Sequence, residues 1–283
     1  MSAPSDSPSP SVTFWGTRGT TPCPGPEFAK YGGHTSCIQV QMGGRNIILD
    51  AGTGLQALDK TIDATGSVDL LFSHTHLDHI MGFPHFKALF SPAFSCHIRA
   101  GHLGAGQSIE QVVANFMQPP YFPMPVTMFN AGLQYTDFAA GEAFPLGDDV
   151  IVQTIAINHT NGATGYRLRY GDKSVCYLTD IEHEGAFYRD GWPDPALTDF
   201  VKGSDVLIYD CSYTDDEYSK RKGRGHSSWQ AGMQLADAGQ VGTFAIFHHD
   251  PAHDDDFMDD IAGQAVAVRP GTIVARDGLV LAL

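Results

Sequence analysis

Short apolar runs recur along the chain and alternate with stretches of helical spacing. The apolar runs are of strand length, rich in Val, Ile, Leu and Phe, and bounded by turn-forming residues, which predicts β-strands. The predicted strands cover residues 12–16, 37–42, 46–50, 68–73, 150–157, 165–170, 175–179, 205–210, 243–247, 272–276 and 279–283. Periodic apolar positions predict helices over residues 54–62, 80–90, 108–117, 228–237 and 255–268.

Strand pairs occur early and late in the chain, with helices between them. This order favours an α/β fold with two sheets packed face to face and helices outside. Ser228 is a suitable N-cap for the helix that follows it, and Gly239 a suitable stop. Residues 1–11 alternate Ser and Pro and predict a flexible tail, whereas residues 12–283 contain no repeat or charged linker and are expected to form one domain.

The amino-acid composition and net charge exclude some kinds of function. The 283 residues are 42% hydrophobic, which is enough for a large core. Thirty-two acidic against 17 basic residues give a formal charge of -15, which argues against extended nucleic acid but allows a small phosphorylated substrate beside bound cations. No apolar run is long enough for a membrane, no signal pattern opens the chain, and five scattered cysteines favour reduced thiols. We therefore expect a cytoplasmic protein without a membrane partner.

The strongest chemical signal directly follows the apolar run 68–72. Residues 73–79 read Ser-His-Thr-His-Leu-Asp-His. Alternating His74 and His76 can point two imidazoles at one ion, while Asp78 and His79 face a neighbouring position. Structural histidines rarely recur at this density, and imidazole nitrogens suit zinc and other divalent first-row ions.

Three further polar residues follow apolar strands. His159 lies after the run 151–157, Asp180 ends 175–179, and His248 ends 243–247. Each alone could be an ordinary loop residue. Together with the first cluster they predict a centre for two divalent cations at one rim of a sheet sandwich, with zinc as the default and manganese or iron as alternatives.

These residues resemble the metallo-β-lactamase superfamily, and the match runs from Phe14-Trp-Gly-Thr-Arg-Gly to His248-His-Asp-Pro. The resemblance implies a single-domain, four-layer αββα sandwich with metals at one edge between the sheets. It assigns His74, His76 and His159 to the first metal. It gives Asp78, His79 and His248 to the second, with Asp180 bridging and Asp50 supporting the site. Pro251 selects His248 rather than His249, and a homodimer is a family-based expectation.

The phosphodiesterase branch of the superfamily, which includes ribonuclease Z and small cyclic-phosphate phosphodiesterases, is the most similar. Asp180 stands where many β-lactamases carry Cys, and Gly-His-Ser-Ser at 225–228 resembles a loop whose histidine protonates the leaving oxygen. His226 could otherwise be a helix-entry residue. The absence of a long basic arm argues against tRNA as substrate. Two positions depart from the family pattern: Leu77, where Trp or Gly is common, and His34, where Asn is expected.

The expected function is hydrolysis of a small phosphodiester such as a cyclic nucleotide. Asp78 would orient or deprotonate the nucleophile, and His226 would protonate the leaving group. The proline-rich stretch 118–125, with Phe116, Tyr121 and Phe122, could form an aromatic wall for a nucleobase. A metal-dependent hydrolase of a thioester, lactone or β-lactam is the first alternative, and a non-catalytic nucleotide-binding protein the second. The roles of four residues stay open in the sequence. Glu182 and His183 lie near the predicted rim and could support the ligands, His249 could touch substrate, and His34 could reach the cleft or be an ordinary loop residue.

Overall fold

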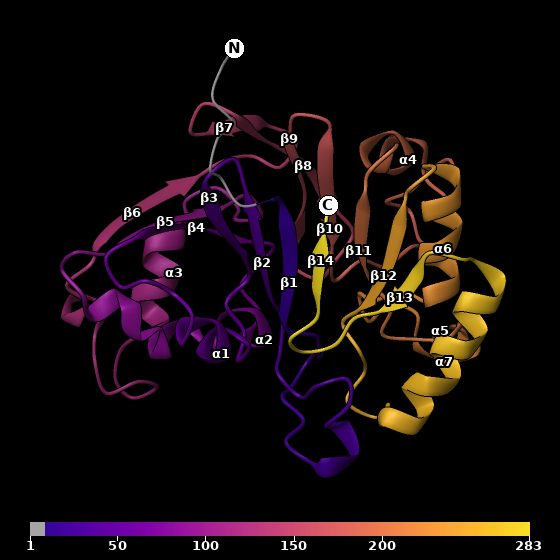
Figure 1. Ribbon diagram of the computed structural model, residues 1–283, viewed down its shortest axis with the longest axis horizontal. Coiled ribbons are helices and arrows are strands. Elements are labelled where there is room, and N and C mark those ends of the chain that lie inside the picture. Colours follow the sequence, from indigo (N-terminus) through magenta and orange to yellow (C-terminus); the bar gives the residue numbers. More distant parts are fainter. Residues whose placement is uncertain (1–8) are drawn as a thin grey trace.

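The computed structural model describes residues 9–283, and its strands form two seven-stranded sheets (Figure 1). The first sheet has the order β14-β1-β2-β3-β4-β5-β6, and the second β13-β12-β11-β10-β9-β8-β7. The strands are β1 (Ser11–Gly16), β2 (Cys37–Met42), β3 (Arg45–Leu49), β4 (Ser67–Phe72), β5 (Ser95–Ala100), β6 (Gly132–Asp137), β7 (Ala143–Leu146), β8 (Val150–Ile157), β9 (Ala163–Tyr170), β10 (Lys173–Leu178), β11 (Val206–Asp210), β12 (Thr243–Phe247), β13 (Thr272–Val274) and β14 (Val280–Ala282).

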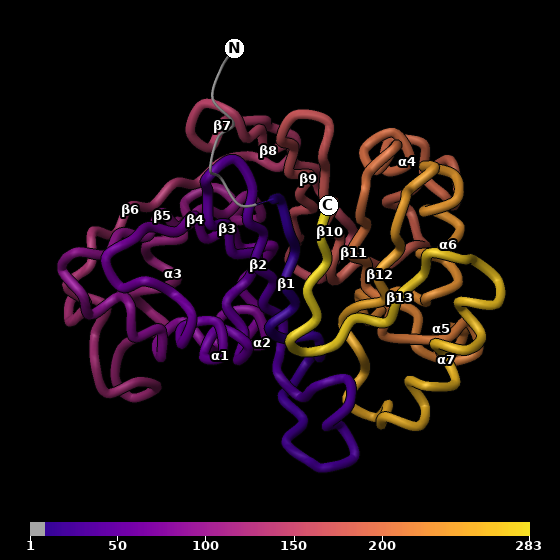
Figure 2. Tube along the Cα trace, viewed as in Figure 1, coloured from indigo at the N-terminus to yellow at the C-terminus, as the bar shows by residue number. Residues whose placement is uncertain are grey.

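Helices cover the outer face of each sheet (Figure 1). They are α1 (Leu55–Asp59), α2 (Leu77–Ile80), α3 (Ile109–Phe116), α4 (Pro195–Val201), α5 (Asp215–Arg221), α6 (Trp229–Ala238) and α7 (Asp255–Val268). Short 3₁₀ turns occur at Pro26–Phe28, Phe83–His85, Lys87–Phe90 and Val126–Met128. The trace in Figure 2 shows the C-terminal strand returning beside the first one, where β14 pairs antiparallel with β1.

Three clusters of buried apolar side chains fill the spaces between the four layers. One lies between the two sheets, where Phe247 of β12 packs against Phe14 of β1 and Tyr177 of β10. The second lies between the first sheet and its helices, and the third between the second sheet and helices that include α6 and α7. Removing this apolar surface from water is the main stabilising contribution. The four-layer αββα sandwich expected from the sequence is confirmed.

Parallel pairing creates one chemically rich edge. Strands β10, β11 and β12 are parallel neighbours, as are β3 and β4 in the other sheet. The carboxyl ends of parallel strands meet at the same edge of a sheet, so the residues that follow these strands are brought together.

The predicted helix over residues 80–90 is wrong. The chain there forms the single turn α2 and then two 3₁₀ turns. Pro84 has no backbone N–H to continue an α-helical ladder, and Gly82 packs so closely against the backbone of Gly52 that a side chain could not fit.

Strands β5, β6 and β7 and helices α4 and α5 were not predicted. Most side chains of β6 and β7 remain at least partly exposed, so these strands lack a continuous apolar run. Within the predicted tail 1–11, residues 1–8 lie outside the described residues, and β1 begins at Ser11. Within residues 9–283, no helix has both the length and the apolar character needed to cross a membrane.

Candidate metal centre

The loop after β4 and the first turn of α2 carry four of the expected ligands. His76 is the N-cap residue of α2 and has an extended backbone, and Asp78 and His79 lie within its single turn. His74, Asp78 and His79 are buried, whereas His76 is partly exposed. The change from extended backbone to helix at His76 turns the alternating side chains toward two adjoining positions.

The first group consists of His74, His76 and His159. Nε2 of His74 lies 2.9 Å from Nδ1 of His76, and Nε2 of His159 lies 3.1 Å from the same atom. Both Nε2 atoms are 3.7 Å from Oδ1 of Asp180. Three imidazole nitrogens therefore converge on one small region beside a carboxylate, an arrangement that could hold a cation.

The second group consists of Asp78, His79, Asp180 and His248, all buried. Oδ2 of Asp180 lies 3.1 Å from Nε2 of His79 and 3.2 Å from Nε2 of His248. Oδ2 of Asp78 lies 3.2 and 3.3 Å from the same two nitrogens. Because Asp180 directs one oxygen to each group, its carboxylate can bridge two adjacent cations.

The residues present fit divalent cations. Nε2 of His79 is a buried polar atom without a hydrogen-bond partner among residues 9–283, although carboxylate oxygens surround it. Burial, followed by the charge of His79, lowers the pKa of His74 well below its usual value. Burial alone would raise the pKa of Asp180, but the charges of His248 and His79 hold it well below its usual range. A neutral imidazole and an ionised carboxylate are the forms that coordinate metals. Although burial alone would lower them, the neighbouring carboxylates Asp78 and Asp180 raise the pKa values of His79 and His248, so a bound cation would replace the protons on these two rings.

Three of these imidazoles, those of His79, His159 and His248, are oriented through the ring nitrogen that faces away from the two groups. His79 Nδ1 lies 2.8 Å from Asp50 Oδ2, which also accepts a hydrogen bond from Tyr177. His159 Nδ1 donates to the carbonyl of Gly225 at 2.8 Å, and His248 Nδ1 lies 3.0 Å from Ser212 Oγ. Such contacts fix the tautomer and ring orientation of metal-binding histidines. Asp50 therefore lies where the family resemblance implies.

The backbone at this edge is strained. Asp50, Asp180 and His248 directly follow β-strands or lie within two residues of one, and their φ angles are +62°, +53° and +61°. Side chains other than glycine rarely adopt this left-handed conformation, which costs about 1–3 kcal/mol where the surrounding structure enforces it.

His226 lies beside the two groups. Its Nδ1 is 2.9 Å from Asp210 Oδ2, and its ring stacks on His248 with centroids 5.0 Å apart. Burial alone would lower the pKa of His226, but the charge and hydrogen bond of Asp210 raise it to about 9. With Nδ1 engaged by Asp210, Nε2 is the nitrogen available for proton transfer.

Two cavities adjoin the centre. One, of about 620 Å³, includes His159, Gly225, Lys222 and Phe187 in its lining. The other, of about 380 Å³, includes His74, His76, His102 and Asn161. The aromatic wall expected from Phe116, Tyr121 and Phe122 is absent from both linings. Tyr121 is 81% exposed, whereas Phe116 and Phe122 pack against the cluster under the first sheet.

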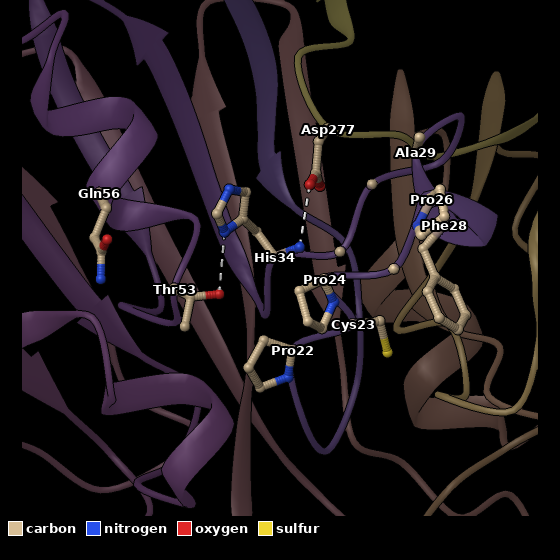
Figure 3. Close-up of a pocket in the computed structure, with 13 residues that line it drawn as sticks. Pro22, Cys23, Pro24, Pro26, Phe28, Ala29, His34, Thr53, Gln56 and Asp277 are labelled. Carbon is tan, nitrogen blue, oxygen red and sulfur yellow. Dashed lines mark hydrogen bonds between the residues drawn. The ribbon is translucent and has the colours of Figure 1, made fainter.

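His34 lines a separate cavity of about 540 Å³, formed largely by the loop after β1 (Figure 3). Its backbone N–H donates to Asp277, and its ring contacts Thr53. None of the seven expected ligands belongs to this lining. His249 is fully buried, its Nε2 donates to the carbonyl of Ala275, and it lines neither cavity beside the centre.

Sequence reasoning missed Asp210, Ser212 and the Gly225 carbonyl. Asp210 ends β11, and a carboxylate at the carboxyl end of a buried strand is the same signal that identified Asp180. The contacts of Ser212 and Gly225 depend on how distant loops meet, and no local pattern reports this.

Comparisons with known proteins agree with this geometry. The family model of the β-lactamase superfamily domain matches residues 45–249. Ribonuclease Z of Clostridium tetani is 23% identical over 96% of this chain and 98% of that relative. A diphosphatase from the PhnP family and the short form of human tRNase Z superpose with TM-scores of 0.69 and 0.68, at 18% and 17% identity. They cover 97% and 96% of this chain, and 98% of each of those chains. The chain belongs to the β-lactamase superfamily, as a metal-dependent hydrolase.

Proposed function

We propose that the protein is a phosphodiesterase with a dinuclear metal centre that acts on a small phosphodiester, such as a cyclic nucleotide. The observation that carries the proposal is the Asp210–His226 pair beside the two ligand groups. An alkoxide is a poor leaving group and needs an acid to protonate it, whereas a thiolate needs one far less.

In this proposal, different residues of the chain would hold the cations, orient the nucleophile and protonate the leaving group. His74, His76 and His159 would hold one cation, Asp78, His79 and His248 a second, and Asp180 would contact both. When bound, such cations act as Lewis acids and lower the pKa of water, and zinc is the default from the donor set. Asp78 would orient the nucleophile. His226 would give its Nε2 proton to the departing oxygen, and Asp210 would stabilise the imidazolium beforehand.

Basic residues lie close to His226 in the sequence but are largely paired. Lys220, Arg221, Lys222 and Arg224 fall within five positions, and Lys222 pairs with Glu184 while Arg221 pairs with Asp250. The cavity beside His159 is lined by Lys222 together with Glu182 and Glu184. The attraction for an anionic substrate would therefore come chiefly from bound cations, which reverse the local sign of the charge.

A small substrate is favoured over extended nucleic acid. The net charge of -15 repels a long polyanion, and the two adjoining cavities have room for groups of nucleotide size. The ribonuclease and diphosphatase names of the relatives support phosphorus–oxygen bonds as the target.

The test compares wild-type protein and His226→Ala, both loaded with zinc or manganese, on cyclic nucleotides, bis(4-nitrophenyl) phosphate, thioesters and lactones. We expect turnover of a phosphodiester, and a fall in kcat of about 10²- to 10⁴-fold in His226→Ala on alkoxide leaving groups. Turnover confined to thioesters, lactones or β-lactams, and insensitive to His226, would favour the first alternative. Tight nucleotide binding without any product would favour a binding protein.

A further inference from the structure

The loop that carries His226 has a second carboxylate anchor outside the metal groups. Glu182 follows Asp180 by two positions and is 8% exposed. Its Oε1 accepts the backbone N–H of Gly223 at 2.6 Å, and its Oε2 accepts the backbone N–H of Gly225 at 2.9 Å. The hydroxyl of Tyr218 donates a third hydrogen bond, to Oε1, at 3.2 Å.

This segment needs an external anchor. Between the end of α5 at Arg221 and the start of α6 at Trp229 the chain forms no helix or strand, and its backbone bridge to Tyr213 begins only after His226, at Ser227 and Ser228. Gly223 and Gly225 have φ angles of +84° and +83°, a conformation that glycine adopts without penalty but does not enforce. The two N–H groups that donate to Glu182 belong to the residues on either side of Arg224, and the second of them, Gly225, directly precedes His226.

The neighbouring residue extends the same contact. His183 Nδ1 lies 2.7 Å from Ser227 Oγ, which is also 2.9 Å from the hydroxyl of Tyr209. Glu182 and His183 therefore hold the chain on both sides of His226. The backbone N–H of Ile181, in the same loop, donates to Asp210, the partner of His226.

A direct chemical role does not suit Glu182. Glu182 lines the cavity beside His159, but both of its oxygens accept backbone N–H groups, and it is absent from the groups among the described residues that could hold a cation. We propose that Glu182 is a positioning residue that fixes the Gly223–Gly225 backbone and so aims His226 at the leaving group. This inference rests on the proposed function for its kinetic consequence, but its structural part can be tested without a substrate.

The kinetic test uses Glu182→Gln, which keeps the shape but replaces one acceptor oxygen by an N–H donor that faces a backbone N–H. On a phosphodiester with an alkoxide leaving group we expect kcat to fall by about tenfold or more, because general acid catalysis contributes ~10²- to 10⁴-fold. On bis(4-nitrophenyl) phosphate, whose leaving group needs no acid, the change should stay below about twofold. In a His226→Ala background Glu182→Gln should add little, because residues that act as one unit are not additive.

Glu142→Gln is the matched control, because Glu142 also accepts a backbone N–H, from Ala139, in the turn before β7. Hydrogen exchange of the segment 222–227, followed by mass spectrometry, should accelerate in Glu182→Gln and not in Glu142→Gln. Metal content should equal that of the wild type. Unchanged exchange, equal losses on both leaving groups or loss of metal would overturn the positioning role. Faster exchange with no phosphodiester turnover even in the wild type would instead overturn the proposed function alone.

Discussion

Gly225 serves three contacts within a single residue. Its N–H donates to Glu182, its carbonyl accepts from His159, and its Cα lies against the His159 ring. A Cβ added there would overlap the His159 ring, whereas a Cβ added at Gly223 would meet no atom within 4 Å. The two glycines have nearly the same positive φ angle. Alanine substitutions at the two positions therefore introduce similar backbone strain, and only the one at Gly225 also crowds a neighbouring side chain.

We expect Gly225→Ala to bind less metal than Gly223→Ala. Both changes place alanine in the left-handed region, which costs roughly 1–2 kcal/mol, but only Gly225→Ala displaces His159. Elemental analysis after dialysis against limiting zinc measures the difference. Equal metal content in the two variants would contradict the role of the Gly225 carbonyl in orienting His159.

Asp277, in the separate cavity of Figure 3, is expected to make stability depend on pH. Burial raises its pKa from 3.8 to about 6, although hydrogen bonds from His34 and Thr17 oppose the rise. A carboxyl whose pKa is raised on folding stabilises the folded state while protonated. That contribution is complete below about 3.8 and is lost as pH rises through about 6, and at most roughly 3 kcal/mol is involved.

Asp277→Asn cannot ionise, so its unfolding free energy relative to wild type should rise between pH 4.5 and pH 7.5. Urea denaturation at intervals across that window measures the difference. Asp149→Asn, at an exposed position, is the control and should follow the wild type throughout. If Asp277→Asn also runs parallel to the wild type, its carboxyl does not titrate in the predicted window.

At the scale of elements, the local sequence was sufficient to predict a helix or strand where a single pattern, either apolar or amphipathic, runs through the whole segment. Strands β2, β8 and β12 and helix α7 have the predicted bounds, because each is a continuous apolar or amphipathic segment closed by a turn or cap. Strand β6 was not predicted because only Leu133 and Tyr135 of its six residues pack against the core, and the rest of the strand is held by pairing with β5. The helix predicted over 80–90 failed because tight contact at Gly82 and the missing N–H of Pro84 outweigh apolar spacing.

Helix α7 offers a test of capping. Asp254 accepts the backbone N–H of Phe257 at 2.9 Å and is the N-cap of the helix. Asp254→Ala should lower the unfolding free energy by about 1 kcal/mol. Asp260→Ala, an exposed change inside the same helix, should leave it unchanged or raise it slightly. Chemical denaturation of both variants measures their unfolding free energies. Equal losses in Asp254→Ala and Asp260→Ala would show that the Asp254 cap does not stabilise the helix.

At the scale of the whole molecule, the proposed ligands come from both sheets. His74, His76, Asp78 and His79 follow β4 of the first sheet, whereas His159, Asp180 and His248 follow strands of the second. Strand-end polarity made these residues recognisable in the sequence. Other residues around the centre, such as Ser212 and Glu182, become apparent only when segments more than 25 residues apart meet in space.

Cations that bind both sets would join the two sheets. Removal of metal by a chelator should therefore lower the melting temperature by at least about 5 °C, because a ligand that binds only the folded state stabilises it. Scanning calorimetry before and after chelation, and again after zinc or manganese is returned, measures the effect. Identical thermograms in all three states would show that no cation stabilises the fold.

The left-handed backbone at Asp50, Asp180 and His248 has a consequence for how this protein can change. Glycine is the residue that relaxes each of these three positions, but it would remove the partner of His79 at position 50 and a proposed ligand at positions 180 and 248. Selection for thermal stability alone would therefore favour glycine at these three positions, whereas selection for turnover would keep the side chains and the backbone strain that comes with them. Stability and the proposed catalysis would therefore compete at the same three residues, and a more stable variant that keeps its activity would have to gain stability elsewhere in the sandwich.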